Sequence, residues 1–365
     1  MRPPVQLDVL PRAHASTVHV EEAQRARERN RADRRLIDAH GRVIRDLRLS
    51  ITDRCNFRCV YCMDPDVRFL DAARLLTVDE LVRVARLCVD LGIDRIRLTG
   101  GEPTLHPRLD DIIAGVAALG VADLSMTTNG ALVDHERAER WKRLGLRRLT
   151  FSLDSVEEHA FSRMTRSTSS PAKVVEAIRA AKDAGLGPIK VNAVVVRGMN
   201  EDQVPLLAGL ARDIGFEMRF IEYMPLDSGR KWSTDLLVPA HEIVNLIRTA
   251  HPIIPRGKAE PSSTSDSWAF ADDPEMRHAG IGIIAPVTRA FCGACSRLRI
   301  TADGQVRPCL FSLREFDLRA VMRSGADNTA TEDFLLDSVW MKQAGHGISA
   351  PEFAQPARSM SAIGG

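Results

Sequence analysis

The stretch Cys55–Cys62 reads CNFRCVYC and places three thiols, those of Cys55, Cys59 and Cys62, within eight residues. This C-x3-C-x2-C spacing lets three thiolates hold three corners of a [4Fe–4S] cube while the fourth iron stays open. A structural zinc site is normally closed by a fourth protein ligand. The spacing therefore predicts a cluster whose open iron is a place for substrate.

Two simpler explanations of this string are three buried core cysteines or a zinc knuckle completed by a distant histidine. The residues between and beside the cysteines are polar, and apolar cores rarely place three thiols in such a string. These polar neighbours are Asp53, Arg54, Asn56 and Arg58. The pattern favours the iron–sulfur cluster.

From Arg45 onward, short β-type runs alternate with helical patterns, and the first run ends just before the cysteine string. We expect six strands. Their ranges are 46–52, 95–99, 124–128, 147–154, 189–196 and 216–223. Such alternation means parallel strands with helical crossovers, in either an open doubly wound sheet or a (β/α) barrel.

The helices between these strands have recognisable start and stop signals. Thr77 and Glu80 form a capping box for a helix that closes near Gly92. Asn200 is expected to cap the helix that precedes the sixth strand. Other helices are expected over 109–120, over 135–145 and from Ser170-Pro171 to Gly185.

Residues that suggest chemistry gather at the carboxyl ends of the expected strands, where parallel α/β folds place their active sites. Strand ends also need turn residues for purely structural reasons. In the string TGGEP, Gly100 and Gly101 let the backbone approach a ligand closely, and Glu102 supplies a charged acceptor. The other strand-end residues of this kind are Thr128, Asn129, Ser152, Asp154 and Met224.

A second group of cysteines lies near the C-terminus. Cys292 and Cys295 form C-x2-C, and thirteen residues separate Cys295 from Cys309. Taken alone, the group could be half of a zinc site that recruits a histidine, with His278 and His346 as candidates. The seventh cysteine, Cys88, falls on the apolar stripe of a helix and is expected in the core.

The composition is that of an ordinary soluble protein, with 365 residues of which 44% are hydrophobic, enough for one large domain and a smaller one. With 50 basic and 48 acidic side chains, nothing global calls for nucleic acid or an acidic membrane. No apolar run approaches the roughly 20 residues of a membrane helix, and no secretory signal is recognisable. The clustered cysteines favour a reducing compartment, so we expect a cytoplasmic protein.

Residues 1–44 are expected to form a charged, mobile N-terminal extension, because EEAQRARERNRADRR is rich in charge and poor in aromatic residues. Its acids, Glu21, Glu22 and Glu28, argue against a transit peptide. At the other end, the stretch 327–361 is loosely patterned, which leaves the path of the chain end open.

With Tyr61 between its last two cysteines, the string C-x3-C-x-Y-C resembles the radical S-adenosylmethionine (SAM) superfamily. Together with the second cysteine group, it resembles the GTP 3′,8-cyclase family of molybdenum cofactor biosynthesis. The resemblance implies an incomplete (β/α)6 TIM-like barrel over residues 45–250 and a C-terminal auxiliary iron–sulfur region over residues 251–365. The segment AEPSSTSDS, at 259–267, looks like a flexible connection.

The resemblance also implies ligands for SAM and for two [4Fe–4S] clusters. The two cysteine groups would hold the clusters, with the open iron of the first binding SAM. SAM contacts are expected from Tyr61, Gly101, Glu102, Ser152 and Met224. The terminal Gly364-Gly365 matches a double-glycine tail that enters the active site in this family.

For GTP, the resemblance implies contacts from Arg48, Arg97, Thr128, Lys190, Arg297, Leu298 and Arg299. The string SRLRITADGQVRPC reads as a hairpin with its turn at Asp303-Gly304. Period-two spacing points Arg297 and Arg299 to one face of the strand, where paired guanidinium groups suit a triphosphate. An isolated R-x-R would more simply be a solvated strand face.

The implied activity is that of a radical SAM lyase, which converts GTP to (8S)-3′,8-cyclo-7,8-dihydroguanosine 5′-triphosphate. The implied partners are an electron donor such as flavodoxin or ferredoxin and the cyclic pyranopterin monophosphate synthase that takes the product. The sequence leaves open whether the chain is a monomer or a homodimer. Two alternatives are a radical SAM peptide maturase with an auxiliary cluster and a non-catalytic, zinc-stabilised binding module.

Overall fold

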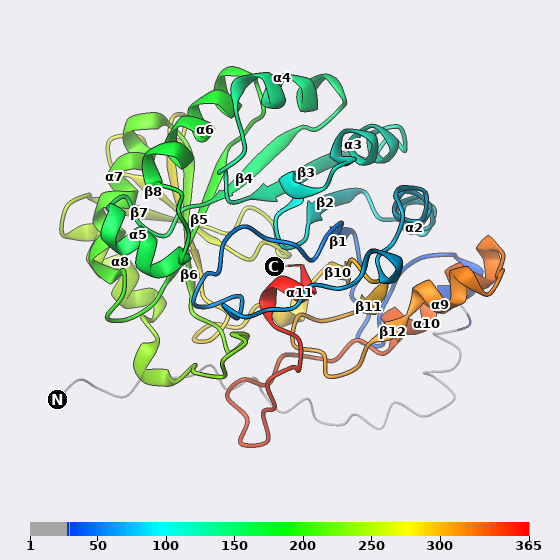
Figure 1. The fold of residues 1–365 in the computed structure, drawn as a ribbon. Coiled ribbons are helices and arrows are strands. Elements are labelled where there is room, and N and C mark those ends of the chain that lie inside the picture. Colours follow the sequence, from blue (N-terminus) through cyan, green and yellow to red (C-terminus); the bar gives the residue numbers. More distant parts are fainter. Residues whose placement is uncertain (1–27, 29, 365) are drawn as a thin grey trace.

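A computed structural model describes residue 28 and residues 30–364 of the chain (Figure 1). In this part of the chain, twelve strands form one open sheet in the order β12-β11-β10-β1-β2-β3-β4-β5-β6-β9-β8-β7. The strands are β1 (Asp46–Ser50), β2 (Arg95–Thr99), β3 (Asp123–Thr128), β4 (Arg148–Ser152), β5 (Lys190–Val195), β6 (Glu217–Glu222), β7 (Ile253–Gly257), β8 (Asp266–Phe270), β9 (Gly280–Ile284), β10 (Arg297–Ile300), β11 (Gln305–Arg307) and β12 (Phe316–Asp317).

Strands β1 to β6 are parallel neighbours in sequence order. They lie within two residues of the six predicted strands at every end. The expected incomplete (β/α)6 barrel is therefore confirmed, with a sheet that stays open. Among the described residues, no helix is long and apolar enough to cross a membrane.

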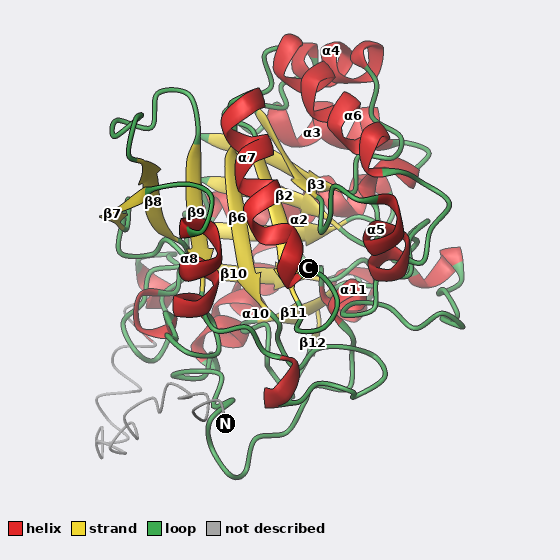
Figure 2. Ribbon diagram, turned by 90° about the vertical axis from the view of Figure 1, so that its left-hand side faces the viewer, coloured by secondary structure: helices red, strands yellow, loops and turns green. Residues whose placement is uncertain are grey.

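Helices cover the outer face of the sheet (Figures 1 and 2). Outward side chains such as Leu49, Leu98 and Met126 are fully buried in the main core. The helices are α2 (Val78–Asp90), α3 (Leu109–Ala117), α4 (His135–Arg143), α5 (Glu158–Thr165), α6 (Pro171–Asp183), α7 (Val204–Ile214), α8 (Ala240–Arg248), α9 (Leu318–Arg323), α10 (Asn328–Trp340) and α11 (Met360–Ile363).

Most of the predicted helix signals act as expected. The Thr77 side chain accepts from the Glu80 backbone, and the Glu80 carboxylate accepts from the Thr77 backbone at 2.8 Å, which confirms the capping box. Asn200 differs, because α7 begins only at Val204 and the Asn200 side chain makes no cap. Its amide instead donates to the Asp154 and Val194 carbonyls and ties the end of β4 to β5.

The chain beyond residue 250 supplies both edges of the sheet. Strand β10 pairs with β1 in parallel, and β9 pairs with β6 in parallel. Antiparallel strands β11 and β12 extend one edge, and β8 and β7 extend the other. The sheet therefore curves round an inner face that both parts of the chain line.

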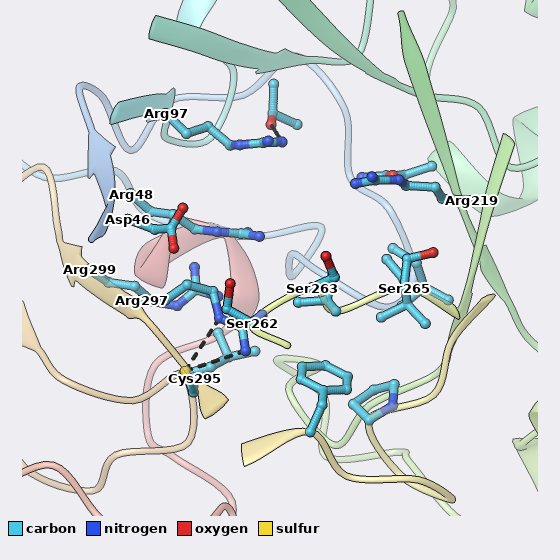
Figure 3. Close-up of a pocket in the computed structure, with 18 of the residues that line it drawn as sticks. Asp46, Arg48, Arg97, Arg219, Ser262, Ser263, Ser265, Cys295, Arg297 and Arg299 are labelled. Atoms are coloured by element: carbon cyan, nitrogen blue, oxygen red, sulfur yellow. Dashed lines mark hydrogen bonds between the residues drawn. The ribbon is translucent and has the colours of Figure 1, made fainter. Parts of the chain in front are cut away.

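The segment 259–267 covers most of the loop of the β7–β8 hairpin and the first two residues of β8, so it connects two paired strands of the sheet. Its Glu260 carboxylate lies 2.6 Å from the guanidinium of Arg95, which belongs to β2 in the middle of the sheet. The serines of the loop line the inner face of the barrel (Figure 3). The loop thus crosses from one edge of the sheet toward its centre.

The predicted mobile extension over residues 1–44 is too long at its C-terminal end. Leu36 and Ile44 are buried, and the Arg42 guanidinium forms a buried ion pair with Asp38 at 2.6 Å. Residues 1–27 and 29 lie outside the described part of the chain. The loosely patterned stretch 327–361 contains helix α10, which packs beside α2 and α9.

Candidate functional site

A cavity of about 480 Å³ lies on the inner face of the sheet. Alternate residues along the strands point into it, as Figure 3 shows for Arg48, Arg97 and Arg219, because successive side chains of a strand face opposite sides. The charged residues of the lining are Asp46, Arg48, Arg95, Arg97, Asp123, Arg148, Asp154, Lys190, Glu217, Arg219, Glu260, Arg297, Arg299 and Lys342.

Four arginines give the cavity its unbalanced positive charge. Within the described residues, Arg48, Arg97, Arg297 and Arg299 form no ion pair with a carboxylate, whereas Arg148 pairs with an aspartate of β3. Burial, with Arg299 and Arg297 nearby, holds the pKa of Arg48 well below its usual value. Burial, with Arg297, lowers the pKa of Arg299 to about 9. Such a cluster of mutually repelling cations is suited to a polyanion.

Lys190 lies on the β5 side of the same cavity. Its Nζ lies 3.1 Å from the Glu217 carboxylate, which also accepts a hydrogen bond from Arg219 at 2.6 Å. Burial, together with Arg219, lowers the pKa of Lys190 to about 8. One carboxylate is thus shared by two cations, and the excess positive charge remains on this side as well.

The three thiols of the first cysteine string lie in the loop that follows β1. Burial raises the pKa of Cys55 to about 11, and burial with Cys55 raises the pKa of Cys62 to about 12. The pKa of Cys59 is raised by burial and also by its two fellow cysteines, so the three thiols interact with one another. Metal ligation needs thiolates, so iron bound here would displace their protons.

Beside these cysteines, an aromatic and an acid reach the cavity. The Tyr61 hydroxyl donates to Asp154 Oδ2 at 2.8 Å, and the Val194 backbone donates to Asp154 Oδ1 at 2.9 Å. Burial raises the pKa of Asp154 to about 6. Ser152 and Met224 line the cavity with them. This end of the cavity offers hydroxyl, carboxylate and thioether groups to a ligand.

The glycines of TGGEP allow a close approach to protein backbone. A Cβ on Gly101 would lie 2.3 Å from the Arg54 carbonyl oxygen, and one on Gly100 would lie 2.4 Å from that of Thr52. The Gly101 backbone donates to the Thr52 carbonyl at 2.8 Å. The turn therefore supports the loop that carries the cysteines, and the predicted contact of Gly101 with SAM stays a prediction.

Glu102 is buried and accepts several hydrogen bonds from neighbouring protein groups. Its carboxylate accepts from the Thr104 hydroxyl at 2.7 Å, the Thr128 hydroxyl at 2.8 Å and the Asn129 backbone at 2.7 Å. Glu102 thus joins the ends of β2 and β3 beneath the cysteine loop. Its predicted contact with SAM stays a prediction.

The second cysteine group lies at the opposite end of the sheet. Cys295 comes just before β10, which runs parallel to β1, whereas Cys55 comes just after β1. All three C-terminal cysteines line the cavity. Burial opposes ionisation of Cys295, but Arg297 and Lys342 outweigh it and lower the pKa of the thiol to about 6.

Each cysteine group fits three corners of an iron–sulfur cube by its donor chemistry. The Arg297 guanidinium donates to the Cys295 sulfur at 3.4 Å, as expected for a thiolate ligand. Among the described residues, no three His, Cys, Asp or Glu side chains converge on a position for a single metal ion. Three thiols are the donors that such a cluster needs, and the C-terminal set lines the cavity.

The chain end enters the space between these two thiol groups. The Gly364 carbonyl accepts a hydrogen bond from Arg299 at 2.6 Å, and a Cβ on Gly364 would lie 2.3 Å from the Ser50 hydroxyl. Hydrogen bonds from Ser361 help to hold down the pKa of Cys62. Gly365 lies outside the described residues. The tail therefore contacts both an arginine of the cavity and a cysteine of the first group.

Comparison with known proteins identifies the family. Residues 49–211 match the Radical SAM superfamily, and residues 216–348 match Molybdenum Cofactor Synthesis C. A GTP 3′,8-cyclase of Mycolicibacterium smegmatis is 44% identical over 92% of this chain and 93% of its own length. The chain belongs to the GTP 3′,8-cyclase family. A cyclase of Streptomyces coelicolor is also 44% identical, over 90% of this chain and 96% of its own length.

Solved structures with bound S-adenosylmethionine share the fold of this GTP 3′,8-cyclase family member. SuiB from Streptococcus suis, bound to S-adenosylmethionine, matches with a TM-score of 0.60 at 15% identity, over 84% of this chain and 68% of that chain. Native anSMEcpe with bound AdoMet matches with a TM-score of 0.52 at 13% identity, over 82% and 81% of the two chains. These likenesses confirm the partial barrel.

Most of the residues predicted from the family resemblance line the cavity. They are Tyr61, Ser152 and Met224 for SAM, and Arg48, Arg97, Lys190, Arg297 and Arg299 for GTP. The Leu298 side chain lies on the opposite face of β10 in the core. The Thr128 hydroxyl is bonded to Glu102, and its neighbour Thr127 faces the cavity instead. The predicted GTP contacts of Leu298 and Thr128 stay predictions, and any contact of Leu298 would come from its backbone.

Several cavity residues were not predicted as ligand contacts. Arg148 and Arg219 add two cations, and Ser125, Thr127 and Asn192 add polar groups. The signal that could have found them is strand alternation: each lies an even number of positions from an inward residue of its own strand. The hydroxyl-rich β7–β8 loop carried no such signal.

Proposed function

We propose that this chain is a GTP 3′,8-cyclase, a radical SAM lyase that forms (8S)-3′,8-cyclo-7,8-dihydroguanosine 5′-triphosphate from GTP in molybdenum cofactor biosynthesis. The observation that carries the proposal is a cationic cavity lined at one end by Cys292, Cys295 and Cys309 and at the other by Tyr61 of the first cysteine string. The family membership supports it, since relatives of that name match at 44% identity over more than nine-tenths of their length.

Cys55, Cys59 and Cys62 would hold the first [4Fe–4S] cluster, and SAM would lie beside Tyr61, Ser152 and Met224. Bound there, the cluster and SAM supply the radical chemistry. The protein positions the two reactants and keeps water away, because the site lies inside the barrel. The Asp154 carboxylate, held by Tyr61 and the β5 backbone, is placed to accept hydrogen bonds from a sugar hydroxyl.

Cys292, Cys295 and Cys309 would hold the second [4Fe–4S] cluster, at the end of the cavity where the arginines gather. Arg297 and Arg299 project from alternate positions of β10, and Arg48 lies opposite Arg299 in the register of β1 and β10. Three guanidinium groups on adjacent strands are suited to the oxygens of a triphosphate. Lys190 and Arg219 add charge across the cavity.

The test is GTP affinity of the anaerobically reconstituted protein, measured by calorimetry. We expect R297A and R299A each to weaken binding about tenfold or more, because each removes charge-assisted hydrogen bonds. Arg212→Ala is the control, since Arg212 is half exposed on α7 and pairs with Asp272. No GTP binding by the parent, or parental affinity in both cavity variants, would contradict the proposal.

The reaction itself is tested by incubating the reduced protein with SAM and GTP without oxygen. We expect 5′-deoxyadenosine and a cyclised purine nucleotide. Formation of 5′-deoxyadenosine alone, with GTP unchanged and a peptide required, would favour a peptide maturase. Zinc with no labile sulfide would favour the binding module.

The proposed partners follow from this reaction. Reduction of the first cluster needs an electron donor such as flavodoxin or ferredoxin, and the cyclic pyranopterin monophosphate synthase would take the product. A homodimer is also proposed. Sedimentation of the reconstituted protein tests the last point, with a single monomeric species as the contradicting result.

A further inference from the structure

Lys342 is a buried cation that the proposed GTP chemistry does not use. It follows helix α10, lines the cavity and is only 4% exposed. Its Nζ donates to the Arg297 carbonyl at 2.7 Å and also to the Pro308 carbonyl. The first acceptor lies two residues after Cys295, and the second lies directly before Cys309. One ammonium thus links the two chain segments that carry these thiols.

The residues after Lys342 link the remaining cysteine. The buried Arg42 guanidinium donates to the Cys292 carbonyl at 2.8 Å, to the Ala344 carbonyl at 2.9 Å and to the Gln343 carbonyl at 2.7 Å. Asp38 fixes Arg42 through an ion pair at 2.6 Å. The short segment 342–344 is therefore the point at which all three C-terminal cysteine segments are joined.

Lys342 also carries charge next to the thiols. Its ammonium lies against the carbonyls of Arg297 and Pro308, which are two residues and one residue away in sequence from Cys295 and Cys309. A cube held by three thiolates is negatively charged, and each added electron increases that charge. A cation fixed in a buried, weakly screening environment stabilises the more negative state more strongly.

We propose that Lys342 is a positioning residue for the C-terminal iron–sulfur cluster, which holds its three cysteine segments together and stabilises the reduced cluster through its charge. The inference rests on the second cluster of the proposed function. Arg42 also helps to hold the cysteine segments together, because it bonds the Cys292 segment to residues 343 and 344. Arg297 differs from Lys342 because its guanidinium, which faces the cavity, is assigned to substrate.

The test uses the full chain with C55A, C59A and C62A, so that only the C-terminal cluster is present. Iron and sulfide content and the midpoint potential from an EPR-monitored dithionite titration are compared for this parent and its K342M variant. Met keeps the length of the side chain and removes the charge. We expect K342M either to lose the cluster or to have a midpoint potential at least 59 mV more negative than that of the parent. A shift of 59 mV corresponds to a tenfold change in the one-electron equilibrium.

Lys142→Met is the matched control. Lys142 donates to the Gly185 carbonyl at 2.7 Å, a contact of the same kind that lies away from the cysteines. The midpoint potential and iron content of the K142M variant should equal those of the parent. K342M with all cysteines intact should still load four irons at the first site, which shows that the barrel folds.

The outcomes separate the two claims. A parent without an iron–sulfur spectrum at the C-terminal site overturns the second cluster of the proposed function, and with it this inference. A loaded parent whose K342M variant keeps parental iron content and potential overturns the role of Lys342 alone. Failure of the intact-cysteine K342M variant to load its first cluster also overturns it, because the effect would then be global.

Discussion

At the scale of single residues, the cavity is shaped by which cations have an acidic partner. Glu217 accepts from Arg219 at 2.6 Å and lies 3.1 Å from the Lys190 ammonium, so one carboxylate serves both. Burial and Arg219 lower the pKa of Lys190 to about 8. An ordinary lysine titrates near about 10.4. Lys190 is therefore expected to lose its charge as the pH rises through about 8.

GTP affinity is accordingly predicted to depend on pH through Lys190. The triphosphate binds the charged form, which dominates below pH 8 and is lost as the pH rises through the lowered pKa. Affinity should be constant toward about pH 7 and fall toward about pH 9. K190R should lack this step, because arginine stays charged throughout. Calorimetric titration across this range checks the prediction, and a flat parental profile would contradict it.

Cavity residues could be predicted where a two-residue spacing along a strand placed their side chains on the same face of the sheet. Arg297 and Arg299, two positions apart on β10, both line the cavity as expected. Leu298 lies between them and faces the core for the same reason. At the end of β3, a shift of one position exchanges Thr128 for Thr127, because adjacent strand residues face opposite sides.

At the scale of elements, the path of the C-terminal tail is fixed by one arginine. Arg358 donates to both carboxylate oxygens of Asp303, at 2.9 and 2.8 Å, and to Glu315 at 2.9 Å. Asp303 lies in the β10–β11 turn and is nearly buried. Six residues later, Gly364 meets Arg299 of the same hairpin. The hairpin therefore holds the tail at two points.

R358Q is predicted to free the tail and to lower the free energy of unfolding by about 2 kcal/mol, because the buried Asp303 loses its charged partner. Carboxypeptidase should release the terminal residues several-fold faster than from the parent, as followed by mass spectrometry. Arg256→Gln, at an exposed position of β7, is the control. Equal release from R358Q and the parent would show that Arg358 does not hold the tail.

The elements with strong local signals were predictable, and those held by tertiary contacts were not. The Asp303-Gly304 turn was expected from its sequence and is confirmed, with a φ of +77° at Gly304. Helix α10 was missed because its buried face is not uniformly apolar: Thr331 and Ser338 are buried along with Leu335, Leu336 and Val339. Its place depends on packing against α2 and α9.

At the scale of the whole molecule, the sheet carries apolar residues outward and charged residues inward, and its two edges are completed by the last third of the chain. The strand and helix alternation predicted parallel strands but left open whether they form a flat sheet or a barrel. Sequence patterns could not decide this, because β9 and β10 join β6 and β1 from more than 50 residues away along the chain. The cavity forms only when β9 and β10 are both paired with the sheet.

A chain that ends at residue 250 is therefore predicted to fold poorly. It retains β1 to β6 but lacks β10 and β9, so the backbone groups of β1 and β6 become unpaired edges. Exposed edges of long strands promote association between chains. We expect most of the shortened chain in the insoluble fraction and no cooperative thermal transition in the remainder. A chain ending at Ile363 keeps every strand and should match the parent in both measurements. A soluble 1–250 chain that unfolds cooperatively would show instead that the predicted barrel region over residues 45–250 folds independently, and that the edge strands contribute to the site but not to its folding.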